Sequence, residues 1–258
     1  MSHRAKHHET ATAHTAPLLP SAEKMPAEHR AALLPEKQFQ WRGGEITRLE
    51  AFCDVIFGFA MTLLVVSLEV PRSYAELMQA MRGFVPFAAC FAQLVMIWRT
   101  HYKFSRRYGL EDPYTSFLNV VLLFLVLFYV YPLKFVFTQL YAEVTGNSVE
   151  NISPHQVSML MLIYGLGFAA VFLLFVLMYA HAYRLRKPLC LNAVETLLTQ
   201  QSIQQNVILA AIGLLSCLVA LKYPAGAGWV YFLIGPLLAA QGAITGRKAR
   251  LIAESGKS

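Results

Sequence analysis

Charged residues are scarce in this chain, at 14% of its 258 residues, while hydrophobic residues make up 56%. Soluble globular domains carry about 25% charged residues, and the mean hydropathy of +0.46 likewise excludes an ordinary soluble protein and predicts an integral membrane protein. The net charge is +7, but Lys and Arg occur in short clusters between apolar runs. Such clusters are typical of the flanks of membrane helices, and they give no indication of a nucleic-acid partner.

The signatures of common catalytic and metal sites are also absent from the sequence. It contains no Gly-rich phosphate loop, no HExxH sequence and no nucleophile elbow, so we expect neither an enzyme nor a bound cofactor. Four histidines near the N-terminus lack a rigid scaffold for a metal ion: His3, His7, His8 and His14. The cysteines form no CxxC pair and predict neither a zinc site nor a disulfide framework: Cys53, Cys90, Cys190 and Cys217.

Six apolar runs are long enough to cross a membrane as helices. They cover residues 52–70, 83–98, 114–137, 157–183, 206–221 and 229–245, which predicts an all-α, six-helix transmembrane domain over residues 41–246. Residues 1–40 lack helical apolar periodicity and are predicted to form a disordered cytoplasmic tail. Residues 247–258 are predicted to form a basic cytoplasmic tail, and the polar segment 192–205 is interpreted as a linker that could lie along the membrane interface as a helix.

The distribution of basic residues predicts how these helices are oriented. Basic clusters mark four helix ends on one side of the membrane: Arg42 and Arg48; Arg99, Lys103, Arg106 and Arg107; Arg184, Arg186 and Lys187; Arg247, Lys248 and Arg250. The loops on the opposite side hold few basic residues: Arg72, Arg82 and Lys222. By the positive-inside rule, both termini are cytoplasmic.

Polar residues gather near the cytoplasmic ends of the first three runs: Arg48, Asp54, Trp98, His101 and Asn119. Arg48 and Asp54 are six residues apart, or about 240° around a helix, so they cannot readily pair with each other. Each needs a partner from a neighbouring helix, and His101 and Asn119 are available. The cluster is interpreted as a polar clamp that holds the first helix in place. A proton relay through His101 is the alternative.

A stripe of residues with helical spacing follows the first run: Val55, Phe59, Thr62, Val66 and Glu69. Periodicity alone leaves two interpretations open, because such a stripe can pack in a core or line a conduit. In a conduit, the apolar side chains would form a narrow passage, and the Thr62 hydroxyl could touch a partly dehydrated cation. Glu69 would raise the local cation concentration at the outer mouth.

The same residues resemble a known signature. Arg48-x-x-x-Phe52-Cys53-Asp54, followed by Thr62-Leu63-Leu64 and Pro71, closely resembles the RxxxFSD first-helix signature of the transmembrane protein 175 family of potassium channels. The resemblance continues with Trp98-x-x-His101, Asn119 and Pro132, and it covers about the first half of the chain. It implies that Arg48, Phe52 and Asp54 belong to one structural network with Trp98, His101 and Asn119.

The resemblance also implies an assembly and an activity. Prokaryotic members have six helices per subunit and form homotetramers in which the first helix lines a central pore. We therefore expect a multi-pass protein of the bacterial inner membrane that passively conducts monovalent cations. The sequence has no TVGYG filter, so selectivity for potassium over sodium would be weak and would arise in a hydrophobic constriction.

Two residues depart from the family pattern. Cys53 stands where the signature has Ser, and Phe59 stands where the resemblance implies an Ile or Leu constriction. Four phenyl rings around one axis would occlude a pore more fully than aliphatic chains, although rotation about χ1 can move a ring aside. A non-conducting scaffold or regulatory subunit, and a proton-leak channel, therefore remain alternatives. A haem-binding electron carrier is a weaker one, since His101 and His181 have no second pair across the membrane.

Overall fold

The structure, a computed structural model, describes residues 39–44, 46–66, 71–146 and 153–255. These residues form α2 (Arg48–Val66), α3 (Tyr74–Arg82), α4 (Phe84–Tyr108), α5 (Pro113–Thr145), α6 (Pro154–Arg184), α7 (Ala193–Lys222), the 3₁₀ helix η3 (Pro224–Leu233) and α8 (Ile234–Ser255). Five spans within them are long and apolar enough to cross a membrane, and α3 with α4, which meet at a 42° bend, make a sixth when counted as one span. The predicted all-α membrane fold is confirmed.

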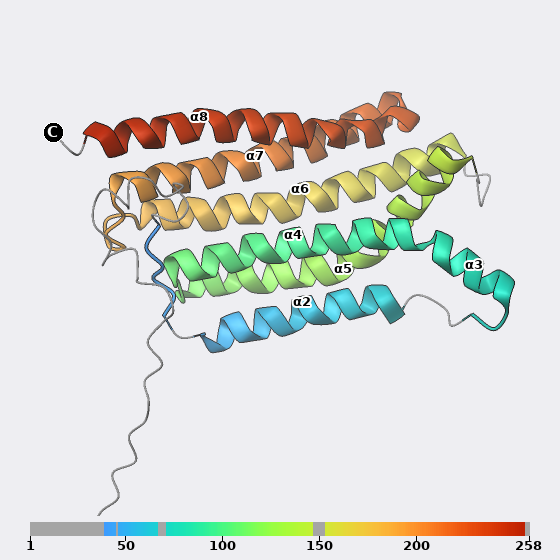
Figure 1. Ribbon diagram of the computed structural model, residues 1–258, viewed down its shortest axis with the longest axis horizontal. Coiled ribbons are helices and arrows are strands. Elements are labelled where there is room, and N and C mark those ends of the chain that lie inside the picture. The colour runs from blue at the N-terminus through green and yellow to red at the C-terminus, as the bar shows by residue number, and fades with distance from the viewer. Residues whose placement is uncertain (1–38, 45, 67–70, 147–152, 256–258) are drawn as a thin grey trace, which may run out of the picture.

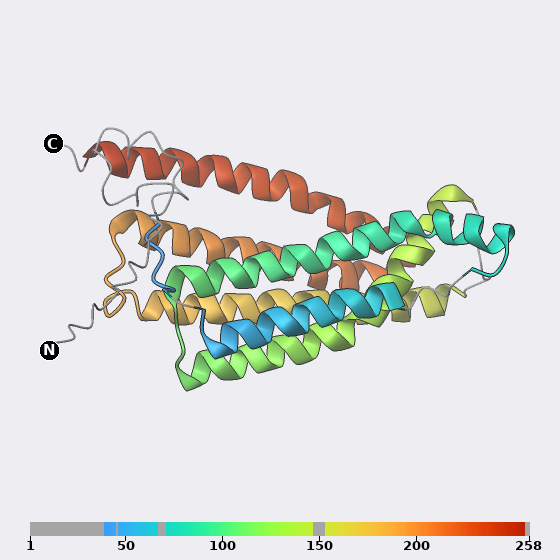
Figure 2. The same ribbon diagram turned by 60° about the horizontal axis from the view of Figure 1, so that its bottom comes forward.

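The helices lie side by side along the long axis of the molecule. Figure 1 shows them in the order α2, α4 with α5, α6, α7 and α8 from one side of the bundle to the other, with α3 beyond one end. The strap, our name for residues 39–44, and the last turns of α8 lie together at the opposite end (Figures 1 and 2). The expected boundary between residues 246 and 247 falls within α8.

The helical conformation expected for the segment 192–205 is present from Ala193 onward, but the segment is not a separate linker, because α7 runs without a break from Ala193 to Lys222. Asn192 begins the helix with a capping box, in which its side chain accepts a hydrogen bond from the Glu195 backbone N–H. Polar side chains in this half of α7 then donate to carbonyls four residues earlier: Thr199, Ser202 and Asn206. These bonds satisfy the polar groups on the buried face of the helix.

The contact between α6 and α7 depends on glycine. A Cβ atom on Gly213 would lie 2.8 Å from the carbonyl oxygen of Gly165, and a Cβ on Gly165 would lie 2.6 Å from the Cys217 sulfur. Real Cβ atoms do not approach other atoms this closely, so the two backbones can meet here only without side chains. Small residues serve the same purpose at many helix contacts in membranes.

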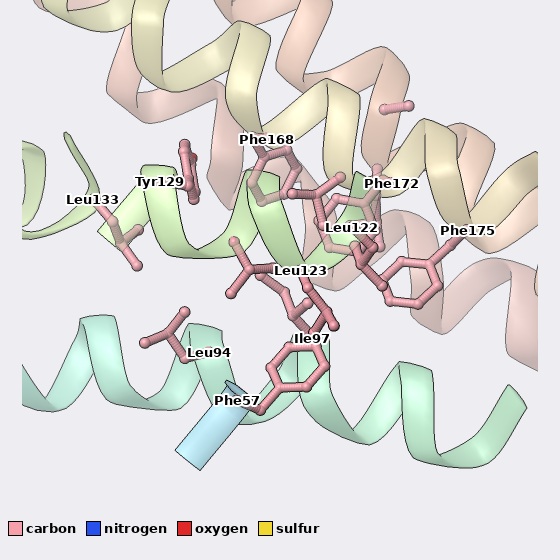
Figure 3. Close-up of a cluster of buried hydrophobic side chains, with 14 of the residues drawn as sticks. Phe57, Leu94, Ile97, Leu122, Leu123, Tyr129, Leu133, Phe168, Phe172 and Phe175 are labelled. Carbon is pink, nitrogen blue, oxygen red and sulfur yellow. The ribbon is translucent and has the colours of Figure 1, made fainter. Parts of the chain in front are cut away.

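The core is a cluster of apolar side chains between α2, α4, α5 and α6 (Figure 3). Its members include Phe57, Leu94, Ile97, Leu122, Leu123, Phe168, Phe172 and Phe175, all buried. Because lipid tails are as apolar as these side chains, close van der Waals packing stabilises the cluster more than exclusion of water does. Phe57 is the largest of the α2 side chains that enter this core.

Candidate functional site

Helix α2 has two contrasting faces. Cys53, Phe57, Ala60 and Leu64 are each no more than 1% exposed and pack against the rest of the subunit. On the other side, Val55 is 67%, Phe59 53% and Val66 76% exposed. Thr62 is exposed beside them. The stripe therefore does not pack in the core formed by this chain.

The exposed face of α2 includes two residues that were expected in the polar clamp. Phe52 is 52% exposed, and Arg48 is exposed and has no hydrogen-bond or ion-pair partner among the described residues. The structure thus does not bring Arg48 to His101 or Asn119, nor Phe52 into the network. Both continue the spacing of four and three residues that begins at Val66 and runs through Val55. The same spacing, extended toward the start of the helix, is enough to place Arg48 and Phe52 on the exposed face from the sequence.

The remaining polar residues tie three helices together in two separate contacts. The indole N–H of Trp98 on α4 donates to Asp54 on α2 at 2.8 Å. His101 on α4 lies 3.1 Å from the Asn119 side-chain oxygen on α5, and both side chains are buried. Because that oxygen can only accept, His101 Nε2 is the donor. The Phe57 ring packs beside the His101 ring, with centroids 5.6 Å apart.

The Thr62 hydroxyl has a defined orientation on the exposed face. It donates to the backbone carbonyl of Phe59, three residues earlier, at 2.7 Å. This bond uses its only hydrogen and leaves the oxygen lone pairs available to accept or to touch a cation. Glu69, the expected residue of the outer mouth, lies outside the described residues.

The strap was missed by sequence reasoning. Arg42 forms a two-pronged ion pair with Glu195 at the start of α7, with distances of 2.7 and 3.1 Å, and its Nε donates to the Leu189 carbonyl at 2.8 Å. Phe39 is buried at 4% exposure, and Gly43 N–H donates to the Arg106 carbonyl. The chain is therefore anchored to α4 and α7 immediately before it enters α2.

The turn before α5 holds a second charged contact at the same end of the bundle. Asp112 caps α5 by accepting hydrogen bonds from Thr115 and lies 3.1 Å from His181 on α6. Burial raises the pKa of the Asp112 carboxyl, but the Thr115 hydrogen bonds and the nearby His181 outweigh this effect and leave the pKa below its usual value. The contact fixes the start of α5 relative to the end of α6.

Within the described ranges, no group of three or more His, Cys, Asp or Glu side chains is arranged to hold a metal ion. The chemistry available on the exposed face of α2 is therefore that of apolar side chains, one hydroxyl and one guanidinium. Such a face can exclude water and touch a small ion, but it offers no group for covalent chemistry.

Comparison with known proteins gives consistent results. The family model described as the endosomal/lysosomal potassium channel TMEM175 matches residues 48–132, which contain α2, α3, α4 and the first part of α5. A protein of Marivirga tractuosa described as a potassium channel is 40% identical over 228 residues, which is 82% of this chain and 92% of that protein. A potassium channel of Chamaesiphon minutus is 29% identical over 96 residues, 34% of this chain and 47% of that one.

Two solved structures share the arrangement of helices. The crystal structure of a variant of the potassium channel MtTMEM175, in complex with a nanobody-MBP fusion protein, matches with a TM-score of 0.69 and 38% identity, over 81% of this chain and 97% of that one. A TMEM175 homologue from Chamaesiphon minutus, with a TM-score of 0.55 and 21% identity over 76% and 96% of the two chains, supports the fold alone. Because one relative is 40% identical to this chain over 92% of the relative's length, this chain belongs to the TMEM175 family.

Proposed function

We propose that the protein is a potassium channel in which the exposed face of α2 lines the central pore of a homotetramer. The observation that carries the proposal is the division of α2 into a face at most 1% exposed and a face at least half exposed. A cyclic assembly around α2 would cover the second face with copies of itself. Relatives described as potassium channels, one of them 40% identical, support the same activity.

Permeation in this proposal is passive and needs no cofactor. Four Phe59 rings would form the hydrophobic constriction, where a cation must shed water to pass. The Thr62 oxygen, one turn away and free to accept, would replace part of the lost hydration. Because no cage of carbonyl oxygens surrounds the ion, we expect selectivity for potassium over sodium to be weak. Val55 and Val66 would extend the apolar wall on either side, and Glu69 would attract cations at the outer mouth.

The proposed orientation places both termini in the cytoplasm. The end of the bundle that carries the strap and the last turns of α8 (Figure 1) also carries the basic clusters at the ends of α4 and α6, as the positive-inside rule requires of a cytoplasmic end. The similar proteins come from bacteria, so we assign the chain to the bacterial inner membrane.

A non-conducting scaffold is the second candidate function, and Phe59 is the observation that favours it. A phenyl ring at the narrowest point of a tetramer could seal the path permanently. In that case the polar contacts of α2 would serve assembly alone.

Ion flux into proteoliposomes distinguishes the two functions. Wild-type protein should pass potassium faster than sodium, and Phe59→Ala should raise the flux of both by roughly tenfold, which corresponds to a barrier lowered by about 1.4 kcal/mol. Phe128→Ala is the matched control, because Phe128 is a similarly exposed phenylalanine, at 66%, on α5. We expect it to leave the flux unchanged.

The possible failures have different meanings. If wild type and both variants are tight to every monovalent cation, the channel assignment is wrong and the scaffold is favoured. If wild type conducts but Phe59→Ala behaves like Phe128→Ala, conduction stands and the constriction lies elsewhere. Size-exclusion profiles of the three proteins must coincide for this comparison.

A further inference from the structure

A basic hollow lies beside the C-terminal half of α4. It has a volume of about 830 Å³ and is lined by Trp41, Val95, Trp98, Arg99, Tyr102, Lys103, Arg106 and Arg107. Four of these eight side chains are cationic, three are aromatic and none is acidic. The hollow therefore concentrates positive charge at one end of the membrane-spanning bundle. Its volume is large enough to hold the polar headgroup of a lipid.

A second hollow continues the first toward α7 and α8. Its volume is about 530 Å³, and it shares Val95, Arg99 and Lys103 with the first. Its lining is polar near Ser202, Gln205 and Asn206, and it is apolar at Ala92, Leu209 and Leu238, which lie farther along the helices from the basic end. Together the two hollows, which we call the basic groove, change from cationic at the membrane surface to apolar toward the membrane interior.

Arg106 supplies a fixed donor to the groove. Its Nη1 donates to the Gly44 carbonyl at 3.0 Å, and its guanidinium lies over the Trp41 ring at 5.3 Å. Its Nε is buried and has no hydrogen-bond partner within the described part of the chain. The guanidinium also interacts electrostatically with the buried Glu50, which holds it at the edge of the groove, where a cationic group can attract an anionic oxygen.

We propose that the basic groove binds the phosphate headgroup of an anionic phospholipid, with an acyl chain along its apolar part. A soluble phosphate would account for the cationic side chains but not for the apolar continuation. The aromatic side chains agree with a lipid as well, because Trp and Tyr concentrate where headgroups meet hydrocarbon. Trp41 and Trp98 both contact Tyr102, with ring centroids 6.4 and 5.7 Å apart.

The bound lipid would also act on α2. Trp98 lines the groove and at the same time donates the 2.8 Å hydrogen bond to Asp54. Trp41 belongs to the strap that leads into the same helix. A headgroup in the groove therefore touches both attachments of the proposed pore-lining helix, so lipid composition would regulate its position. Lipid binding itself does not require the protein to conduct ions.

Quenching of tryptophan fluorescence by brominated lipids tests the proposal directly. Two of the three tryptophans of the chain line the groove, so brominated phosphatidylglycerol should quench the purified protein in neutral detergent at lower mole fraction than brominated phosphatidylcholine. In Arg99→Gln/Lys103→Gln, the apparent affinity for phosphatidylglycerol should fall roughly 30-fold, as expected for the loss of two cationic side chains near an anionic headgroup.

The matched control is Arg184→Gln/Lys187→Gln, which removes two exposed cationic side chains at the end of α6 and should leave quenching unchanged. Equal quenching by both lipids, or an equal loss in the two double variants, would overturn the proposal. Release of the quenching lipid by inorganic phosphate would show a site for soluble phosphate and would also overturn it. Coincident size-exclusion profiles and thermal transitions exclude loss of folding as the cause.

Discussion

Replacing Arg42 with alanine is expected to destabilise the folded subunit by about 3 kcal/mol, because removing one partner of a buried ion pair leaves an uncompensated charge. Glu195 is 1% exposed, and Arg42 holds its carboxylate at 2.7 Å. The expected cost is at the lower end of the usual range of about 3–5 kcal/mol, because the backbone N–H groups of Gln40 and Asn192 still donate to that carboxylate. Arg42→Lys should give an intermediate loss, since lysine keeps the charge without the two-pronged geometry.

The assay is the fraction of monodisperse protein that survives heating in detergent, measured by size exclusion. For a chain of this size, a loss of about 3 kcal/mol lowers the melting temperature by about 6–12 °C. Arg184→Ala, an exposed arginine at the end of α6, serves as the control and should shift the melting temperature by no more than a degree or two.

A second substitution separates the unpaired charge from other causes. In the double variant Arg42→Ala/Glu195→Gln, the side chain at position 195 is neutral but can still complete the capping box with Asn192. We expect the double variant to regain at least half of the lost stability. If the double variant has the same low melting temperature as Arg42→Ala alone, the explanation by an unpaired buried charge is refuted. The stability is then lost through the packing of the strap.

Three further predictions concern helix contacts and ends. Trp98→Phe should lower the free energy of unfolding by about 1.5–3 kcal/mol, because the Asp54 carboxylate loses its charge-assisted hydrogen bond. Adding Asp54→Asn to this variant should recover part of the loss. If it recovers none, the hydrogen bond is not the cause. Asp112 has a pKa below its ordinary value of 3.8, so its contribution to stability is complete above that value and is lost as the pH falls through the folded pKa. Asp112→Asn should flatten this part of a melting-temperature profile against pH, and an unchanged acid limb would contradict it. Gly213→Ala should destabilise the bundle by about 1–3 kcal/mol, because its Cβ would meet an α6 carbonyl at 2.8 Å. Gly242→Ala, which would meet no atom within 4 Å, should be neutral or slightly stabilising on the same melting assay.

The helices were predictable because a segment in hydrocarbon must satisfy its own backbone, so long apolar runs become helices. The same rule did not join the first half of α7 to the apolar run that follows it. There the side chains of Thr199, Ser202 and Asn206 return their hydrogen bonds to the helix backbone. A polar composition therefore does not exclude a partly buried helix when the polar side chains on its buried face bond to carbonyls one turn away.

Helical periodicity was sufficient to predict part of the candidate site. The spacing of Val55, Phe59, Thr62 and Val66 was sufficient to place them on one face, whereas the sequence could not show which face is covered. Arg48 and Phe52 were assigned by motif to the polar clamp, although their register puts them on the exposed face. The pair of Arg42 and Glu195, 153 residues apart, has no local sequence signal at all.

Val55, Phe59 and Val66 on the uncovered face of α2 are each more than half exposed, whereas Phe57, on the opposite face, is surrounded by the core (Figure 3). The side chains on the two faces of α2 can therefore be substituted at different rates during evolution. A lineage can exchange the side chain at Phe59 in a single step, without first acquiring compensating mutations among the buried residues. A departure such as phenylalanine at the expected constriction is the kind of variation this division permits, and related subunits can diversify in permeation while keeping the same fold.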